Sequence, residues 1–200
     1  MRLVLATGNH GKLAELSRML VGSGIEVLSQ KDWAIDSPLE DAATFVENAL
    51  IKARHVAQHS GLPAVADDSG LVVPVLGGEP GVYSARYAGN QGDDYANNQR
   101  LLAELTGVEP ERRQASFHCA MVYLRSAQDP APLIAHGVWH GYIVDSPRGT
   151  NGFGYDPLFA DSHLGLTAAE LDAGSKDERS HRGRAWRDLV DQLKGVGVAS

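Results

Sequence analysis

Two adjacent carboxylates, Asp67 and Asp68, stand in the segment VADDSGLVV at residues 65–73. Asp-Ser-Gly is favourable turn chemistry, so we expect a turn here between two apolar strands. Both carboxylates are ionised at neutral pH and repel each other, and a divalent cation would relieve that repulsion. Magnesium prefers a few carboxylates together with water and substrate phosphates. Glu40 is the second candidate ligand, with Asp41 as its nearest rival, and an ordinary polar turn is the alternative.

A segment that could bind phosphate is TGNHGK at residues 7–12. It follows the apolar run RLVLA, which predicts a buried strand, and it precedes a predicted helix from Lys12 to Leu20. Unpaired amides at a helix N-terminus bind anions, Gly8 and Gly11 would let phosphate oxygens approach the backbone, and Lys12 would add a full positive charge. The pattern is neither a Walker A loop nor GxGxxG, so a capped loop with a surface lysine is the alternative.

Aromatic and basic residues towards the end of the chain form a third candidate site. In NGFGYDP, residues 151–157, Phe153 and Tyr155 lie in a Gly-rich loop, where an aromatic ring can stack on a nucleobase. The alternative is a loop that covers the hydrophobic core. His181 and Arg182 begin the last predicted helix, where positive charges oppose the helix dipole, and residues that break such a local rule are candidates for function.

The elements that must position these residues follow from hydrophobic spacing and capping signals. Thr44–His59 is the clearest helix, because Thr44 and Glu47 form a capping box and apolar residues recur at helical spacing behind it. The pattern predicts an α/β protein with a mixed sheet. The other predicted elements are a strand at 25–29, a helix at Asp93–Leu105, strands at 116–124 and 132–144 in an antiparallel hairpin, and two capped helices from Thr167 and Ser180.

Composition narrows the class of protein. A chain of 200 residues with 43% hydrophobic residues can bury a sizeable core. No apolar run approaches the ~20 residues that span a bilayer, no secretory signal is evident, and Cys119 is the only cysteine, so we expect a soluble, cytoplasmic protein. The net charge of −7 disfavours binding to a long nucleic acid, but a small phosphorylated ligand needs only a few well-placed cations.

Five segments together resemble the inosine triphosphate pyrophosphatase family, whose bacterial members are dITP/XTP pyrophosphatases. The resemblance runs from residue 2 to residue 194, and Arg179 is a departure, since the family has an apolar residue before Ser-His-Arg. The implied fold is α/β, with a long mixed central sheet flanked by helices and two lobes around a deep substrate cleft, in a single ITPase-like domain over residues 1–200 and usually in a homodimer. The segments are TGNHGKLAEL, TFVENALIKA, ADDSGLVVPVLGGEPGVYSARYAG, RGTNGFGYDPLF and TAAEL…SKDERSHRGRA.

The resemblance also implies an activity and a set of site residues. The family hydrolyses deaminated purine nucleoside triphosphates (ITP, dITP and XTP) to the monophosphate and pyrophosphate with magnesium, which keeps damaged precursors out of DNA and RNA. By this resemblance Asp68 is the general base and, with Glu40, a magnesium ligand. The implied substrate contacts are Thr7, Gly8, Asn9, His10, Gly11, Lys12, Ser69, Phe153, Gly154, Tyr155, Asp156, Lys176, His181 and Arg182.

We explain selectivity for the base by a hypothesis about hydrogen bonding. Hypoxanthine carries a 6-oxo acceptor, to which His181, Arg182 or nearby helix amides could donate, whereas adenine would present a 6-amino donor to the same donors. Each unsatisfied buried donor costs about 1–3 kcal/mol. Three other interpretations remain: a pyrophosphatase for other modified nucleotides such as methylated pyrimidines, a nucleotide sensor without turnover, and a sheet-based interaction protein whose Gly-rich loops are structural.

Overall fold

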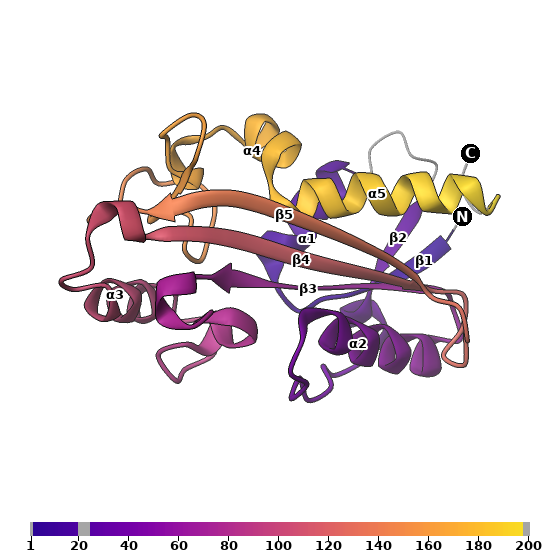
Figure 1. The fold of residues 1–200 in the computed structure, drawn as a ribbon. Coiled ribbons are helices and arrows are strands. Elements are labelled where there is room, and N and C mark those ends of the chain that lie inside the picture. Colours follow the sequence, from indigo (N-terminus) through magenta and orange to yellow (C-terminus); the bar gives the residue numbers. More distant parts are fainter. Residues whose placement is uncertain (1, 20–24, 198–200) are drawn as a thin grey trace. The chain divides into compact units, whose positions relative to one another are not determined.

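The computed structural model describes residues 2–19 and 25–197 of the chain, and within them an α/β fold with a mixed sheet. Six strands lie in the order β2-β1-β3-β4-β5-β6 (Figure 1). β1 pairs in parallel with β2 and β3, whereas β6 pairs antiparallel with β5. The predicted fold class is therefore confirmed. The strands are β1 Arg2–Ala6, β2 Glu26–Ser29, β3 Ala64–Val72, β4 Gln114–Leu124, β5 Leu133–Ile143 and β6 Phe159–Asp161; the α-helices are α1 His10–Met19, α2 Phe45–Ser60, α3 Asp94–Glu104, α4 Ala173–Arg179 and α5 His181–Gly195.

The chain divides into two compact units. Unit 1 comprises Met1–Asp68, Cys119–Gly137 and Arg182–Ser200, and unit 2 comprises Ser69–His118 and Val138–His181. By these bounds β3, β4 and β5 each contribute residues to both units. That residues 1–200 form a single domain stays a prediction. The described residues include no helix that is long and apolar enough to cross a membrane.

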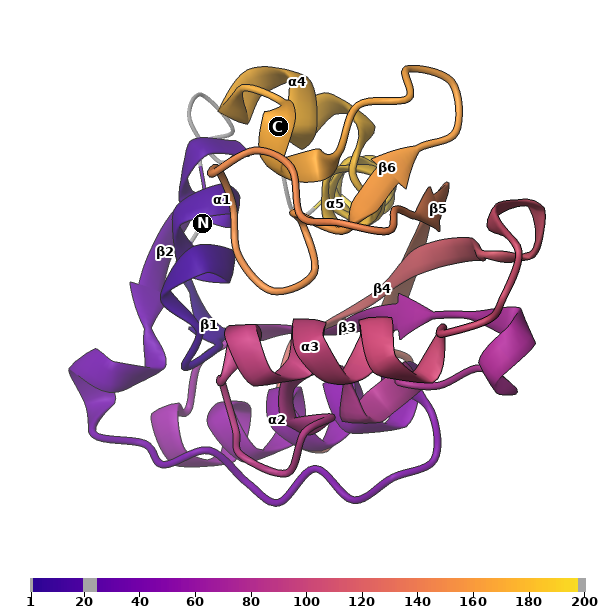
Figure 2. The ribbon, with the colours of Figure 1, turned by 90° about the vertical axis from the view of Figure 1, so that its left-hand side faces the viewer.

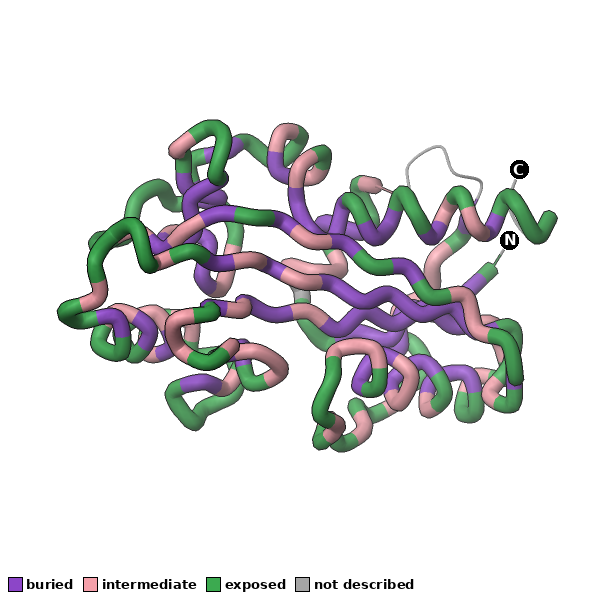
Figure 3. Tube along the Cα trace, in the orientation of Figure 1, coloured by how far each residue is buried: buried purple, intermediate pink, exposed green. Residues whose placement is uncertain are grey.

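In unit 1, strand alternation sends neighbouring residues of β1 and β3 into two different cores. One face packs against α1 and α5, and the other face packs against α2 (Figures 1 and 2). Successive strand side chains point to opposite faces, which explains why β1 reads as a continuous apolar run, and Figure 3 shows it buried. The first core includes Leu3, Leu5, Val65, Leu16 and Leu189, and the second includes Val4, Ala6, Ala64, Ala66, Ala49, Ala53 and Val56.

The predicted helix at Thr44–His59 is confirmed as α2, shifted by one residue at each end. Its capping box forms as expected: Thr44 Oγ1 accepts from the Glu47 amide at 3.3 Å, and the Glu47 carboxylate accepts from the Thr44 amide at 3.1 Å. Gly61 closes the helix at φ 66°, a left-handed conformation that favours glycine. The two caps fix the start and the end of this helix, and with them the placement of the polar residues that it carries.

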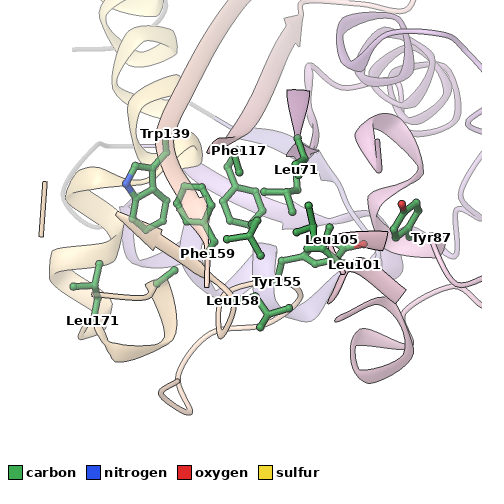
Figure 4. Close-up of a cluster of buried hydrophobic side chains, with 14 residues drawn as sticks. Leu71, Tyr87, Leu101, Leu105, Phe117, Trp139, Tyr155, Leu158, Phe159 and Leu171 are labelled. Carbon is green, nitrogen blue, oxygen red and sulfur yellow. The ribbon is translucent and has the colours of Figure 1, made fainter. Parts of the chain in front are cut away.

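Unit 2 is organised around an aromatic core (Figure 4). The ring centroids of Phe117 and Phe159 lie 4.6 Å apart, and those of Trp139 and Phe159 lie 5.0 Å apart at a steep angle. The predicted helix at Asp93–Leu105 is confirmed as α3, and Asp93 caps it by accepting from the Ala96 amide at 3.0 Å. The strands predicted at 116–124 and 132–144 are confirmed as β4 and β5, which are neighbours in the sheet.

The turn expected at residues 67–70 is wrong, because β3 runs unbroken from Ala64 to Val72. Turn propensity is a local preference, and here burial with ionic partners from other segments overrides it. Val65 belongs to one core and Ala66 to the other, so by alternation Asp67 and Asp68 point to opposite faces of β3. Each carboxylate has its own lysine partner, so a cation bound between the two is not needed to hold them there.

Near the C-terminus the capping signal at Thr167 gives less helix than expected. The box with Glu170 forms, but the chain makes only a 3₁₀ turn, Ala168–Glu170, before it extends at Leu171. A separate helix, α4, follows after Asp172 and was not predicted. The helix predicted from Ser180 is confirmed as α5. The predicted end of the first helix, at residues 20–24, lies outside the described residues.

Candidate active site

The phosphate-loop candidate, residues 7–12, begins where β1 ends. The register pairs Ala6 with Ala66, so the next residues of β3, Asp67 and Asp68, lie just beyond the carboxyl end of β1. Ligands of α/β sheets bind outside the carboxyl ends of strands. The sheet therefore brings the loop and both carboxylates to the same place in unit 1.

Side chains of the loop itself hold its backbone at the start of α1. Thr7 Oγ1 accepts from the Asn9 amide at 3.2 Å, and Asn9 Oδ1 accepts from the Lys12 amide at 3.1 Å, which makes Asn9 the cap of the helix. Gly8 and Asn9 are exposed, while His10 and Gly11 lie in the first turn of α1. The loop thus has the strand–loop–helix geometry that suits an anion.

A buried set of charges joins this loop to α5. Lys12 Nζ lies 2.9 Å from Asp67 Oδ2, and Arg182 Nε lies 3.3 Å from the same oxygen. Arg182, 2% exposed, also donates through Nη1 to Glu15 on α1. Burial alone would raise the pKa of Asp67, but the charges of Lys12 and Arg182 outweigh it and hold that pKa well below its ordinary value. The structure therefore places Arg182 beside Asp67 and Glu15, in the same set of charges as Lys12.

On the opposite face of β3, Asp68 meets an ammonium group that the sequence analysis missed. Lys52 Nζ of α2 lies 3.0 Å from Asp68 Oδ1 and 2.6 Å from Glu40 Oε2. Asn48, one turn earlier on α2, donates to Asp68 at 3.4 Å and accepts from the Ala42 amide at 3.0 Å. These contacts fasten the segment that carries Glu40 to the helix and to Asp68. Burial raises the pKa of Asp68, and the positive charge of Lys52 opposes that rise only in part.

The donor set of Glu40 and Asp68 fits magnesium. Both offer carboxylate oxygens, the ligands that magnesium prefers, and both already converge on one positive charge at Lys52 Nζ. Asp41, the rival of Glu40, is exposed. Within the described part of the chain no three His, Cys, Asp or Glu side chains are grouped to hold a metal. Such an ion would therefore depend on water and substrate phosphates for its remaining ligands, as magnesium commonly does.

In unit 2 the Gly-rich loop is held by a buried ion pair. Asp156 accepts from Lys176 Nζ at 2.6 Å and from the Phe153 amide at 2.8 Å. The Lys176 ammonium also lies 5.0 Å from the centre of the Phe153 ring. Gly152 is required here, since a Cβ at this position would lie 1.9 Å from the Asp156 carboxylate and its φ is 78°. Asp156 and Lys176 thus fold the loop around Phe153.

The two aromatics of this loop lie in different surroundings. Tyr155 is buried in the core of unit 2 (Figure 4), and its hydroxyl donates to the Ser84 carbonyl at 2.8 Å. Tyr155 therefore fits the alternative interpretation of this loop, in which the aromatic side chain packs into the hydrophobic core. Phe153 is only half-buried, so it is the less enclosed of the two aromatics of the loop. Ser69 is half-buried, and His181 is buried with its ring stacked on Phe117 at 4.7 Å.

These features define the class: an α/β protein with a six-stranded mixed sheet, whose cationic loop meets buried carboxylates at the carboxyl end of β1. Residues 3–192 match the model of the Ham1 family. The chain is 66% identical over 193 residues to the dITP/XTP pyrophosphatase of Halorhodospira halophila, covering 96% of this chain and 97% of that relative. It is 52% identical to the dITP/XTP pyrophosphatase of Escherichia coli strain K12, with 96% and 98% covered.

Solved structures agree with this assignment. A HAM1 protein from Coxiella burnetii superposes with a TM-score of 0.90 at 46% identity, covering 98% of this chain and 99% of that one. A nucleoside-triphosphatase / dITP/XTP pyrophosphatase from Mycobacterium abscessus superposes with a TM-score of 0.76 at 45% identity, covering 94% and 98%. The chain belongs to the Ham1 family, and the family resemblance carried by its five sequence segments is confirmed.

Proposed function

We propose that this chain is a dITP/XTP pyrophosphatase that hydrolyses dITP, XTP and ITP to the monophosphate and pyrophosphate in the presence of magnesium. The observation that carries the proposal is 66% identity over nearly the full length to a dITP/XTP pyrophosphatase. The enzyme removes deaminated purine precursors before they enter DNA or RNA. The roles of individual residues below are part of the proposal and are supported by their contacts in each unit.

The phosphates are proposed to bind at the loop of residues 7–12. The N-terminus of α1 lies there, where the helix dipole favours an anion, and Lys12 supplies an ammonium group 2.9 Å from Asp67. A triphosphate is polyanionic, so these donors favour its binding and neutralise charge that builds on the leaving pyrophosphate. The loop and Lys12 thus act on substrate binding and on the leaving group.

Asp68 is proposed to take, or to orient, the proton of the attacking water. The water oxygen bonds to the α-phosphorus, the bond from that phosphorus to the oxygen bridging to the β-phosphorus breaks, and pyrophosphate leaves with the bonding electrons. Lys52 and Asn48 fix the Asp68 carboxylate, and burial raises its pKa, which makes it a stronger base than an exposed aspartate. A magnesium ion held by Glu40 and Asp68 would supply positive charge for the phosphates.

The nucleoside is proposed to bind at the loop of unit 2. Phe153 offers a ring face for the base, and the buried pair of Asp156 and Lys176 keeps the loop folded. Hydrogen-bond donors at the start of α5 would read the 6-oxo group of hypoxanthine or xanthine. Contacts of this kind can discriminate strongly, because the wrong base leaves buried donors unsatisfied.

Replacing His181 with Ala is expected to reduce the preference for ITP over ATP by about tenfold, the discrimination expected from losing one buried donor. The measurement is kcat/KM for both nucleotides. His163→Ala is the matched control, because His163 is an exposed histidine of the same unit. An unchanged ITP/ATP ratio in the His181 variant would show that this side chain does not read the base.

The proposed function is tested by pyrophosphate release from dITP, XTP, ITP, ATP and GTP, with magnesium and with EDTA in its place. We expect fast release from the first three nucleotides, slow release from the last two, and none with EDTA. Release from methylated pyrimidine nucleotides alone would assign the chain to another substrate class. No release from any of these, with ITP still raising the melting temperature, would indicate a nucleotide-binding protein without turnover.

We further propose that the protein acts in the cytoplasm as a homodimer and that residues 1–200 form one domain. Light scattering at micromolar concentration measures the assembly. Cooperative unfolding tests the single domain. Trp33 and Trp186 lie in unit 1 and Trp139 in unit 2, so Trp139→Phe leaves tryptophan fluorescence from unit 1 alone, and the double variant Trp33→Phe/Trp186→Phe leaves it from unit 2 alone. Coincident transitions support one domain, and two separate transitions contradict it.

A further inference from the structure

Side chains of helix α3 form hydrogen bonds with the backbone of the loop that carries Phe153. Asp94 Oδ2 accepts from the Gly154 amide at 2.7 Å, and Asn98 Nδ2 donates to the Gly154 carbonyl at 2.8 Å. Asp94 and Asn98 are one turn apart on α3 and therefore share a face of the helix. Both polar groups of one loop residue, 56 to 60 positions away in sequence, are thus engaged by a single helix.

Gly154 directly follows Phe153 in the loop. Its φ of 63° is in the left-handed region, a backbone conformation that glycine adopts without strain. On one side, Tyr155 is anchored by its hydroxyl bond to the Ser84 carbonyl. On the other side stands Phe153, whose ring is only half-buried. The bonds from α3 to Gly154 therefore hold the backbone directly beside this ring.

We propose that Asp94, assisted by Asn98, is a positioning residue for nucleoside binding, which presets the loop so that the Phe153 ring is ready to stack on the base. This inference rests on the proposed function. We call Asp94 and Asn98 the Gly154 clamp. Neither residue is required to touch the nucleotide, because their effect passes through the Gly154 backbone.

The clamp predicts a specific kinetic pattern. When a binding-competent conformation is populated only in part, the apparent affinity falls by that fraction. Loss of the clamp lowers the population of the competent loop and therefore raises KM. Once the nucleotide is bound, the loop is in place, and the chemistry at Asp68 proceeds as before, so kcat is unchanged. A residue that only stabilised the fold would lower the melting temperature without this split between KM and kcat.

Asp93 provides a matched control. It is the neighbouring aspartate at the same helix end, and it carries the same charge next to the same helix dipole. Its carboxylate caps α3 by accepting from the Ala96 amide, whereas the carboxylate of Asp94 accepts from the Gly154 amide of the loop. Replacing Asp93 with Ala therefore removes charge and helix stability while leaving the Gly154 clamp intact.

The experiment measures KM and kcat for dITP, the melting temperature, and amide hydrogen exchange in the peptide covering residues 150–158, in the wild type and four variants. For Asp94→Ala we expect KM to rise about tenfold, the effect of losing one hydrogen bond to a charged acceptor, with kcat within about twofold and faster exchange at Gly154. Asp94→Asn keeps an acceptor oxygen and restores KM. Asn98→Ala gives a smaller rise in KM, and Asp93→Ala lowers only the melting temperature.

The outcomes separate this inference from the proposed function. Wild-type protein that releases no pyrophosphate from dITP overturns the proposed function. Active wild type with an unchanged KM in Asp94→Ala, or with an equal rise in Asp93→Ala, overturns the clamp. Exchange at Gly154 is independent of turnover, so equal exchange in wild type and Asp94→Ala overturns the clamp even in an inactive protein. If Asp94→Ala does not fold, the KM of Asn98→Ala decides alone.

Discussion

Replacing Asp68 with Asn is expected to lower kcat for dITP by about 10²–10⁴-fold, the usual contribution of a positioned general base. The amide keeps the size of the side chain but cannot accept the proton of the attacking water. Asp68 is well placed for this role, because Lys52 at 3.0 Å and Asn48 at 3.4 Å hold its two oxygens in a buried site. Steady-state kinetics at saturating magnesium measure the loss.

Two controls accompany this prediction. Asp41→Asn changes an exposed carboxylate next to Glu40 and should leave kcat unchanged. A magnesium titration of Asp68→Asn separates the two proposed roles, since a rate that recovers at high magnesium indicates a metal ligand and a rate that stays low indicates a base. Full activity in Asp68→Asn would contradict both roles, and Asp67 and Glu40 would be the next carboxylates to replace.

The sequence predicts those parts of the fold whose causes are local. The capping box of Thr44 and Glu47, the apolar spacing behind it and the closing glycine act within a few residues, and α2 is found where they place it. The same holds for α3 behind its Asp93 cap and for the start of α5. The short helix α4 could not be predicted in this way, because its seven residues are mostly polar and offer no apolar stripe to detect.

Strand β3 shows where local signals are not enough. Asp-Asp-Ser-Gly has turn chemistry, and only contacts from distant segments hold it as a strand. Asp67 meets Lys12 and Arg182, and Asp68 meets Lys52, so each charge is compensated on its own face of the sheet. No pattern within a few residues of Asp67 carries that information. The predicted repulsion between Asp67 and Asp68 also required their side chains to point the same way. In a strand, successive side chains point to opposite faces, so this requirement is not met.

Lys52 and Asn48 are the site residues that the sequence analysis missed, although a signal for them exists. Both fall on the apolar face of α2, among Ala49, Ala53 and Val56, and they are buried there. A charged residue on the buried stripe of a helix is costly unless it is paired, so it indicates a partner on the facing element. The spacing that identified the helix could therefore have pointed to a buried carboxylate opposite Lys52.

Replacing Arg182 with Met is expected to lower the free energy of unfolding by about 3–5 kcal/mol, the cost of breaking a buried ion pair by removing one partner. Arg182 is 2% exposed and contacts two carboxylates, Glu15 and Asp67, of which Glu15 is 4% and Asp67 1% exposed. Lys12 still compensates Asp67 in the variant, so the larger share of the loss comes from Glu15. Urea denaturation measures the change, and Arg184→Met, at an exposed position of the same helix, should stay within about 0.5 kcal/mol of the wild type.

A double-mutant cycle with Glu15→Gln decides what Arg182 does. If the ion pair between Arg182 and Glu15 causes the loss, the double variant Arg182→Met/Glu15→Gln loses much less free energy of unfolding than the two single variants together. The reason is that the neutral amide of Gln leaves no unpaired charge in the buried site. The family resemblance instead implies a contact between Arg182 and the substrate. An Arg182→Met variant with wild-type stability and a raised KM for dITP would contradict the buried pair and favour that contact. Lower stability together with a raised KM would fit one arginine that holds Lys12 in place through Asp67, so that folding and phosphate binding depend on the same buried charges.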